Sequence, residues 1–275
     1  MEVEMPVACG NVLATAIVML TATFFVIYAY RKRKIDKYGL LGAVAVGITV
    51  FLTVGCVGII ALLAFFLFGN LVTKYKFGEK ERMGVAEAQK GKRSLGNVLG
   101  NGLSPSLFGI LYAFSQHPLF LLGFSGAVAT ACADTFATEI GQALCKKPRL
   151  ITNLRRVPVG TNGGVSLAGL CAAFLGASLI SVVSFLSLLS AHSEFFATAT
   201  SQNTATTATT TASAAPLTAP VTLLICTLSG FFGCIADSFL GATLENRNKL
   251  NNHEVNALAT LSGGIFALAL GKFLM

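Results

Sequence analysis

The sequence has no tryptophan, and only 12% of its 275 residues are charged. A soluble domain usually has about 25% charged residues, so this composition excludes an ordinary soluble enzyme. Hydrophobic residues make up 54% of the chain, and the mean hydropathy is +0.72. We therefore expect an integral membrane protein that crosses the bilayer several times.

Other features that would define a class are also missing. The seven cysteines form no Cys-x-x-Cys pair, so we expect neither a disulfide framework nor a zinc site. No Asn-x-Ser/Thr glycosylation site occurs, and the first seven residues, which contain no cation, resemble neither a secretory signal nor a transit peptide. The net charge is +8, but the cations lie in short segments between apolar runs, which indicates membrane topology and no nucleic-acid partner.

Uncharged apolar runs predict the membrane spans. The run 39–73 would be about 52 Å long as one helix, far beyond the roughly 30 Å of a bilayer core, so we expect a break at 55–58. The run 103–133 is expected to break at His117-Pro118, because proline disfavours helix in the residue before it. The expected fold is all-α, a polytopic membrane bundle of about eight transmembrane segments, with spans at 7–30, 39–73 (two), 103–133 (two), 163–190, 221–242 and 257–274.

The chain is expected to form a single membrane domain over residues 1–275, with a disordered loop inserted at 191–220. That loop is rich in Thr, Ala and Ser and cannot form a core. With eight crossings, one side of the membrane receives 19 of the 20 Lys and Arg residues, in segments 31–38, 74–93, 142–158 and 244–256. The positive-inside rule places this side in the cytoplasm or its equivalent.

Three of the twelve acidic residues lie within or at the ends of the expected spans: Asp134, Glu139 and Asp237. An ionisable side chain there costs roughly 2.5 kcal/mol or more unless it has a partner or a function. On a helix, Thr138 shares a face with Asp134, and Thr135 shares one with Glu139. Carboxylate and hydroxyl oxygens suit Mg²⁺, which takes one or two protein carboxylates and completes its shell with water and phosphate. The alternative is that each carboxylate pairs with a nearby arginine.

A glycine-rich segment at 159–166 leads directly into an expected helix. Its backbone N–H groups and the helix N-terminus would favour an anion such as phosphate. The segment lacks the spacing of a P-loop, and a simple turn at the start of a helix is the alternative interpretation. Guanidinium groups upstream match phosphate oxygens, so the candidate phosphate-binding residues here are Arg155, Arg156, Gly160, Thr161, Asn162, Gly163, Gly164 and Ser166.

A second polar stretch precedes the third apolar run. Lys92 and Arg93 are followed by Asn97 and Asn101, which share a helix face and are candidate ligands for a phosphate or a nucleotide base. The alternative is a basic anchor followed by a flexible glycine-rich loop. Further candidate residues are Thr138, Ser238 and Asn256.

Several longer stretches resemble one known family. They are Ala133-Asp-Thr-Phe-Ala-Thr-Glu-Ile-Gly141, Pro158-Val-Gly-Thr-Asn-Gly-Gly-Val-Ser166, Asp237-Ser-Phe-Leu-Gly-Ala-Thr243 and Asn252-His-Glu-Val-Asn256. From about residue 39 to the C-terminus, the chain resembles the phytyl-phosphate kinase and transmembrane-protein-nineteen family, which is related to dolichol kinase and phosphatidate cytidylyltransferase. At Asn162, Gly164 and Asp237 it is more similar to the transmembrane-protein-nineteen branch.

The resemblance implies an integral membrane kinase that transfers a phosphoryl group from a nucleoside triphosphate, usually CTP, to a prenyl monophosphate such as phytyl phosphate. It implies Mg²⁺ as cofactor, with Asp134 as a ligand and Glu139 or Asp237 as its helper. The prenyl chain would lie between helices, in contact with membrane lipid. The residues implied to bind phosphate are Lys92, Arg93, Arg155, Arg156 and the loop 160–164.

Two other classes of function stay open. A transporter or flippase would place its acidic residues near the middle of broken helices, with access from both faces. A non-catalytic multi-pass membrane protein would leave the three carboxylates without a role. Because Asp134, Glu139 and Asp237 are expected at one end of their spans, on the side of the basic segments, we favour the enzyme.

Overall fold

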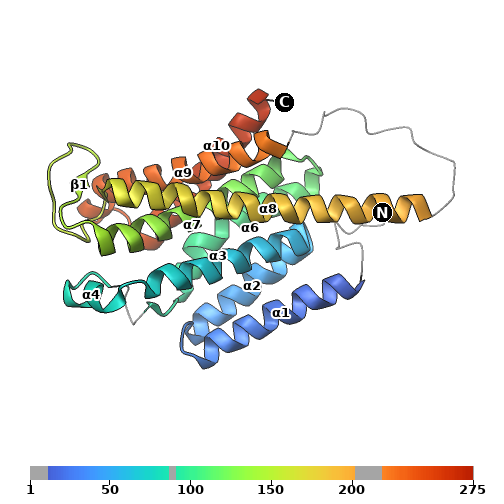
Figure 1. Cartoon of the computed structure of the whole chain (residues 1–275), viewed down its shortest axis with the longest axis horizontal. Helices are drawn as coiled ribbons and strands as arrows, with labels where there is room; N and C mark the ends of the chain where they lie inside the picture. Colours follow the sequence, from blue (N-terminus) through green and yellow to red (C-terminus); the bar gives the residue numbers. More distant parts are fainter. Residues whose placement is uncertain (1–11, 87–90, 202–218, 275) are drawn as a thin grey trace.

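The computed structural model describes residues 12–86, 91–201 and 219–274, and within these ranges it is almost entirely helical (Figure 1). Two short strands, β1 (Arg149–Leu150) and β2 (Gly164–Val165), pair as an antiparallel hairpin. The helices are α1 (Val12–Arg31), α2 (Lys37–Val54), α3 (Cys56–Lys74), α4 (Phe77–Arg82), α6 (Leu95–Ser115), α7 (Leu119–Leu144), α8 (Leu167–Ser201), α9 (Ala219–Thr243), the 3₁₀ helix η1 (Glu245–Arg247) and α10 (Asn252–Leu274). The expected all-α fold is confirmed.

Within the described residues, seven helices are long and apolar enough to cross a membrane: α1, α2, α3, α7, α8, α9 and α10. The eighth long helix, α6, is more polar, because it contains Asn97 and Asn101 together with several glycine and serine residues. It packs against α2, α7 and α10, so it belongs to the same bundle. The expected eight segments therefore correspond to seven apolar spans and one more polar helix.

Both breaks expected inside the long apolar runs are present. Gly55 separates α2 from α3 and has φ 76°, a conformation that favours glycine because it has no Cβ. α6 ends at Ser115 with Gln116 as its C-cap, and Pro118 directly precedes α7, so the turn at His117-Pro118 is confirmed.

Two expectations need correction. α8 continues to Ser201, beyond the expected end of its span at 190, so the first part of the expected loop 191–220 is helical. The part at 202–218 lies outside the described residues. Cys56 is disulfide-bonded, contrary to the expectation that no disulfide forms. Cysteine spacing in the sequence gives no sign of which distant residues come within bonding range.

α7 lies at the centre of the bundle, where it packs against α3, α6, α8, α9 and α10 (Figure 1). Many of its buried residues are small, and among them Ala129 and Thr130 are fully buried. A side chain at Gly233 of α9 or at Gly263 of α10 would clash with Thr130. Small residues therefore determine how closely these three helices approach each other.

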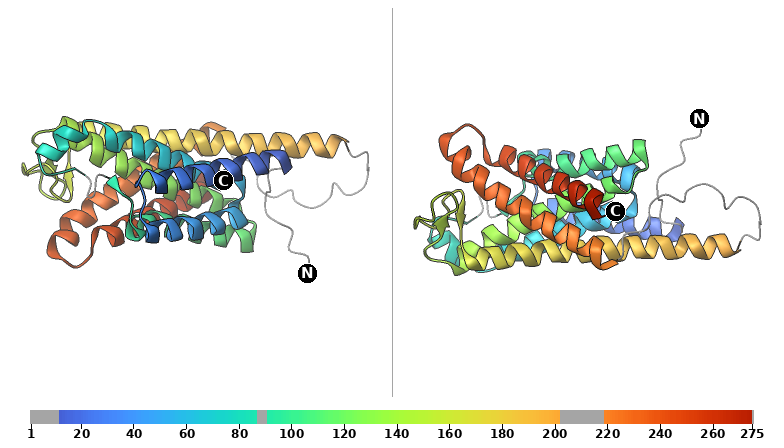
Figure 2. Two further views of the ribbon diagram at one scale, coloured as in Figure 1. Left: turned by 90° about the horizontal axis from the view of Figure 1, so that it is seen from below. Right: turned by 90° about the horizontal axis from the view of Figure 1, so that it is seen from above.

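The segments rich in Lys and Arg gather at one end of the bundle. Figures 1 and 2 show α4 and the β1–β2 hairpin at this end, whereas α2 and α8 finish at the other end. This arrangement agrees with the charge separation expected for eight crossings. Which side of the membrane faces the basic end stays a prediction.

Candidate functional site

A cavity of about 330 Å³ lies between α7, α8, α9 and the segment that joins α7 to α8, and we call it the polar cavity. Among the described residues, no Lys or Arg side chain lines it, so carboxylates provide its charge. Ten candidates from the sequence line it together: Asp134, Thr138, Gly160, Thr161, Asn162, Gly163, Gly164, Ser166, Asp237 and Ser238.

Two carboxylates meet in the polar cavity. Asp134 comes from α7 and Asp237 from α9, and their side chains are in contact. The Oδ2 atom of Asp237 is buried and has no hydrogen-bond partner among the described residues. Two ionised carboxylates this close repel each other, so a proton or a cation must compensate their charge. The pair therefore suits a bound cation.

The carboxylates lie inside the bundle rather than at its rim. Ten residues of α7 follow Asp134, which correspond to about 15 Å of helix, and six residues of α9 follow Asp237. The expectation of acids at the ends of their spans therefore describes Asp237 better than Asp134. The polar cavity reaches from the basic end of the bundle into its interior.

The loop 160–164 lies against α9 and has a fixed shape. Gly163 has φ 76°, and a Cβ at this position would lie 2.5 Å from Ser238 O, so no larger residue fits. Asn246 Nδ2 donates a hydrogen bond to Asn162 O (3.0 Å), which holds the loop from the segment after α9. The loop backbone is therefore presented to the polar cavity beside the carboxylates.

α8 begins at the polar cavity. Ser166 Oγ accepts a hydrogen bond from Gly169 N (3.1 Å), which caps the first turn of the helix. Both residues line the cavity. The positive end of the α8 dipole and the nearby backbone N–H groups favour an anion at this place.

Arg155 and Arg156 are not part of the polar cavity. Both are exposed and lie in the turn that links β1 to β2. The turn is stabilised by Arg149 Nη1, which donates a hydrogen bond to Leu154 O (2.8 Å). The expectation that these arginines clamp a phosphate beside Asp134 is therefore not met. The sequence did not predict the hairpin that carries these arginines, because strands of two residues are too short to leave a periodic signal.

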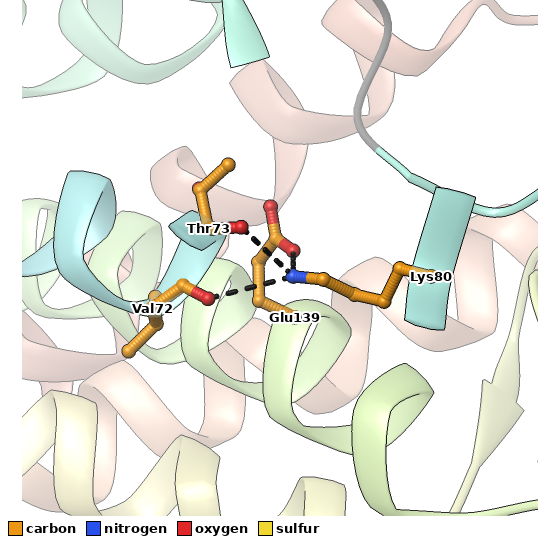
Figure 3. A network of polar contacts seen from close by, with 4 residues as sticks. All are labelled: Val72, Thr73, Lys80 and Glu139. Carbon is orange, nitrogen blue, oxygen red and sulfur yellow. Dashed lines mark hydrogen bonds and ion pairs between the residues drawn. The ribbon is translucent and has the colours of Figure 1, made fainter. Parts of the chain in front are cut away.

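Glu139 also lies outside the polar cavity. It is buried and forms an ion pair with Lys80 of α4, whose Nζ also donates to Thr73 O (3.0 Å) and Val72 O (3.5 Å) at the end of α3 (Figure 3). Glu139 is five positions after Asp134, which places the two side chains about 140° apart around the helix axis. Glu139 therefore is not the helper of Asp134. For Glu139, the alternative interpretation of a carboxylate paired with a cation is therefore correct, although the partner is a lysine and not an arginine.

The candidates around the start of α6 lie elsewhere. Arg93, Asn97 and Asn101 line a second cavity, of about 180 Å³, between α1, α2, α3 and α6. Within the described residues, Lys92 lines neither cavity. Asn256 packs against α6, because a Cβ added at Gly100 of α6 would lie 3.4 Å from the Cβ of Asn256. The single phosphate site expected from the sequence is thus divided between two places.

Gln142, Glu245 and Asn252 also line the polar cavity, although none is a sequence-based candidate. A signal for Glu245 exists in the spacing of Asp237, Gly241 and Glu245, which recur every four residues and share a helix face. Because η1 follows α9 after a single residue, this face continues past the end of α9.

The polar cavity fits a magnesium ion held by few protein ligands. Within the described ranges, no cluster of three or more His, Cys, Asp and Glu side chains could hold a metal ion. Mg²⁺ does not need such a cluster, because it usually takes one or two carboxylates together with water and substrate phosphate. Asp134 and Asp237, whose Oδ2 has no hydrogen-bond partner among the described residues, could provide these two carboxylates.

A helical bundle with an acidic cavity inside its basic end defines a polytopic membrane protein with an internal polar site. More specifically, the chain belongs to the family described as integral membrane protein DUF92, whose model matches residues 20–264. An uncharacterised membrane protein of Methanocaldococcus jannaschii is 33% identical over 239 residues, which cover 86% of each chain. Another, from Synechocystis, is 30% identical over 244 residues, which cover 87% of this chain and 83% of the relative.

A plant protein is also similar to this chain. The chloroplastic protein VTE6 of Arabidopsis thaliana is 29% identical over 248 residues, which cover 86% of this chain and 65% of VTE6. No solved structure matches the chain. These likenesses confirm the family membership expected from the sequence motifs.

Proposed function

We propose that this protein transfers a phosphoryl group from a nucleoside triphosphate to a prenyl monophosphate and so forms a prenyl diphosphate. The contact between Asp134 and Asp237, in a cavity that also contains the loop 160–164 and the start of α8, carries the proposal. Phosphoryl transfer needs charge neutralisation and positioning more than covalent chemistry. The resemblance to the phytyl-phosphate kinase family supports this reaction and CTP as the donor.

The residues of the polar cavity would divide the work. Asp134 and Asp237 hold Mg²⁺, which, when bound, neutralises charge on the transferring phosphate. The loop 160–164 and the first turn of α8 bind a phosphate group through backbone N–H groups. The hydroxyl groups of Thr138 and Ser238 line the same cavity and donate hydrogen bonds to phosphate oxygens.

The position of the polar cavity would let both a lipid phosphate and a nucleotide reach it. Because it lies within the lengths of α7 and α9, a lipid phosphate reaches it without leaving the membrane. The nucleotide enters from the basic end, where exposed cations such as Arg155 and Arg156 attract triphosphates over a distance. These arginines would thus raise the association rate without touching the reacting groups.

The test uses the purified protein with Mg²⁺, labelled CTP, ATP or GTP, and prenyl monophosphates of several lengths. We expect a labelled prenyl diphosphate as product. Asp134→Asn and Asp237→Asn should each lower kcat about 100-fold or more, since a catalytic metal contributes several kcal/mol to transition-state stabilisation.

Glu79→Gln is the matched control for these variants. It removes an exposed carboxylate at the same end of the bundle, where Glu79 pairs with Lys76 at 3.4 Å, and it should keep the parent activity. Absence of product with every donor and lipid, or full activity of Asp134→Asn, would overturn the proposed function.

A further inference from the structure

The residue Val85, which follows α4, packs against the loop 160–164. Gly160 has φ 86°, and a Cβ added there would lie 2.7 Å from Val85 Cγ1 and 3.3 Å from Val85 Cβ. Val85 therefore occupies the side of Gly160 on which any other residue has its side chain. Gly160 and Thr161 line the polar cavity, whereas Val85 does not. Val85 thus supports the loop from outside the cavity.

The loop is held at two places. At one end, Gly163 lies against Ser238 of α9, and Asn246 binds Asn162 O. At the other end, apart from the chain neighbours of Gly160, Val85 is the one described residue with atoms within 4 Å of a Cβ added there. The contact with Val85 is therefore the main side-chain support for this end of the loop.

A buried ion pair fixes the position of Val85. Val85 N donates a hydrogen bond to Lys80 O (3.0 Å), directly after α4. The Lys80 side chain is fully buried, pairs with Glu139 of α7, and donates to Thr73 O and Val72 O of α3 (Figure 3). The support of the loop is thereby tied to α7, the same helix that carries the first carboxylate of the polar cavity.

We propose that Val85 is a positioning residue, which holds Gly160 so that the backbone of the loop 160–164 keeps the shape that receives a phosphate group. The proposal rests on the proposed function, and it adds a residue outside the polar cavity to that function. Glycine has more accessible backbone conformations than any other residue, so a loop with several glycines needs outside contacts to keep one shape. The directional contacts of Lys80 fit this role, because apolar residues often stabilise a fold as well as a buried ion pair does.

Native cysteines provide a readout that does not depend on turnover. Cys234 lines the polar cavity and is 2% exposed. Cys226 is also 2% exposed, lies about two turns earlier on α9 and does not line the cavity. The purified protein is treated with N-ethylmaleimide, and mass spectrometry of its peptides gives the labelling rate of each cysteine. Labelling of Cys234 reports opening of the loop, whereas labelling of Cys226 reports general loosening of the bundle.

Val85→Ala should raise the labelling rate of Cys234 about three- to tenfold, because the loss of two methyl groups weakens the packing on Gly160. The rate at Cys226 should stay unchanged. Val85→Ile keeps both branches on Cβ and should label like the parent. Met83→Ala is the matched control, because Met83 lies on the same segment and is 44% exposed.

Steady-state kinetics test the role in the reaction. Val85→Ala should raise KM for the nucleotide by a similar factor and lower kcat less, because the carboxylate pair is unchanged. Unchanged labelling of Cys234, equal increases at Cys234 and Cys226, or an unchanged KM beside raised labelling of Cys234 would overturn the positioning role. Faster labelling of Cys234 alone supports the contact even if no donor and lipid give a product, a result that would count against the proposed function.

Discussion

Lys80→Met should strongly destabilise the folded protein. Lys80 is completely buried, and Glu139, its ion-pair partner, is 4% exposed. The substitution also removes the hydrogen bonds that Lys80 Nζ donates to Thr73 O and Val72 O. A buried charge that loses its partner costs about 3–5 kcal/mol, so the free energy of unfolding should fall by about that amount.

Two further variants separate charge from packing. Lys76→Met is a matched control on the same segment, because Lys76 forms an exposed ion pair with Glu79 (3.4 Å), and such pairs contribute about 0–1 kcal/mol. Combining Lys80→Met with Glu139→Leu removes both buried charges, and replacement of a whole buried pair by apolar residues is often neutral or stabilising. The double variant should therefore be more stable than Lys80→Met alone.

The assay is equilibrium unfolding in mixed micelles, followed by circular dichroism as the fraction of denaturing detergent rises. The double-mutant cycle should give a coupling free energy near the top of the range of about 0.5–3 kcal/mol found for contacting residues. A loss below about 1 kcal/mol for Lys80→Met, as for an exposed pair, or a coupling near zero would refute the reasoning.

Three shorter predictions concern the polar cavity. Gly163→Ala should lower the free energy of unfolding by about 1–3 kcal/mol and impair turnover, because the φ of 76° disfavours a side chain and a Cβ would collide with Ser238 O. Thermal unfolding and kinetic assays measure both effects. Gly78→Ala, at a position with open space, is the control. Asn246→Ala should raise KM for the nucleotide more than it lowers kcat, since it removes a hydrogen bond to Asn162 O worth about 0.5–1.5 kcal/mol; an unchanged KM would contradict this role. Chelation of Mg²⁺ by EDTA should stop turnover and added Mg²⁺ should restore it, whereas persistent turnover in EDTA would exclude the metal.

The helix breaks were predictable from the sequence, because each depends on the backbone preference of one or two residues, such as Gly55 and Pro118. The ion pair of Lys80 and Glu139 was not, since it joins positions 59 residues apart. Its formation depends on how α3, α4 and α7 pack, and the residues around each partner do not indicate that packing.

Some residues of the candidate site were predictable from local sequence, whereas others depended on how distant segments pack. Asp134 and Asp237 stood out because charged residues are rare in apolar spans, and both line the polar cavity. The expected role of Arg155 depended on the direction of a turn that single-residue preferences do not fix. Glu245 was overlooked because it follows the last apolar residues of its span, although its helix face continues.

The central helix contacts α9 and α10 with one face and α4 with another. On α7, Thr130 contacts α9 and α10, Asp134 meets Asp237, and Glu139 binds Lys80. One residue inserted or deleted between Thr130 and Asp134 would rotate the rest of the helix by about 100°. That single change would remove Asp134 from the polar cavity and Glu139 from its lysine at once. Homologous chains that keep both contacts should therefore keep the length of this stretch unchanged, while the hairpin turn at 151–156 tolerates insertions.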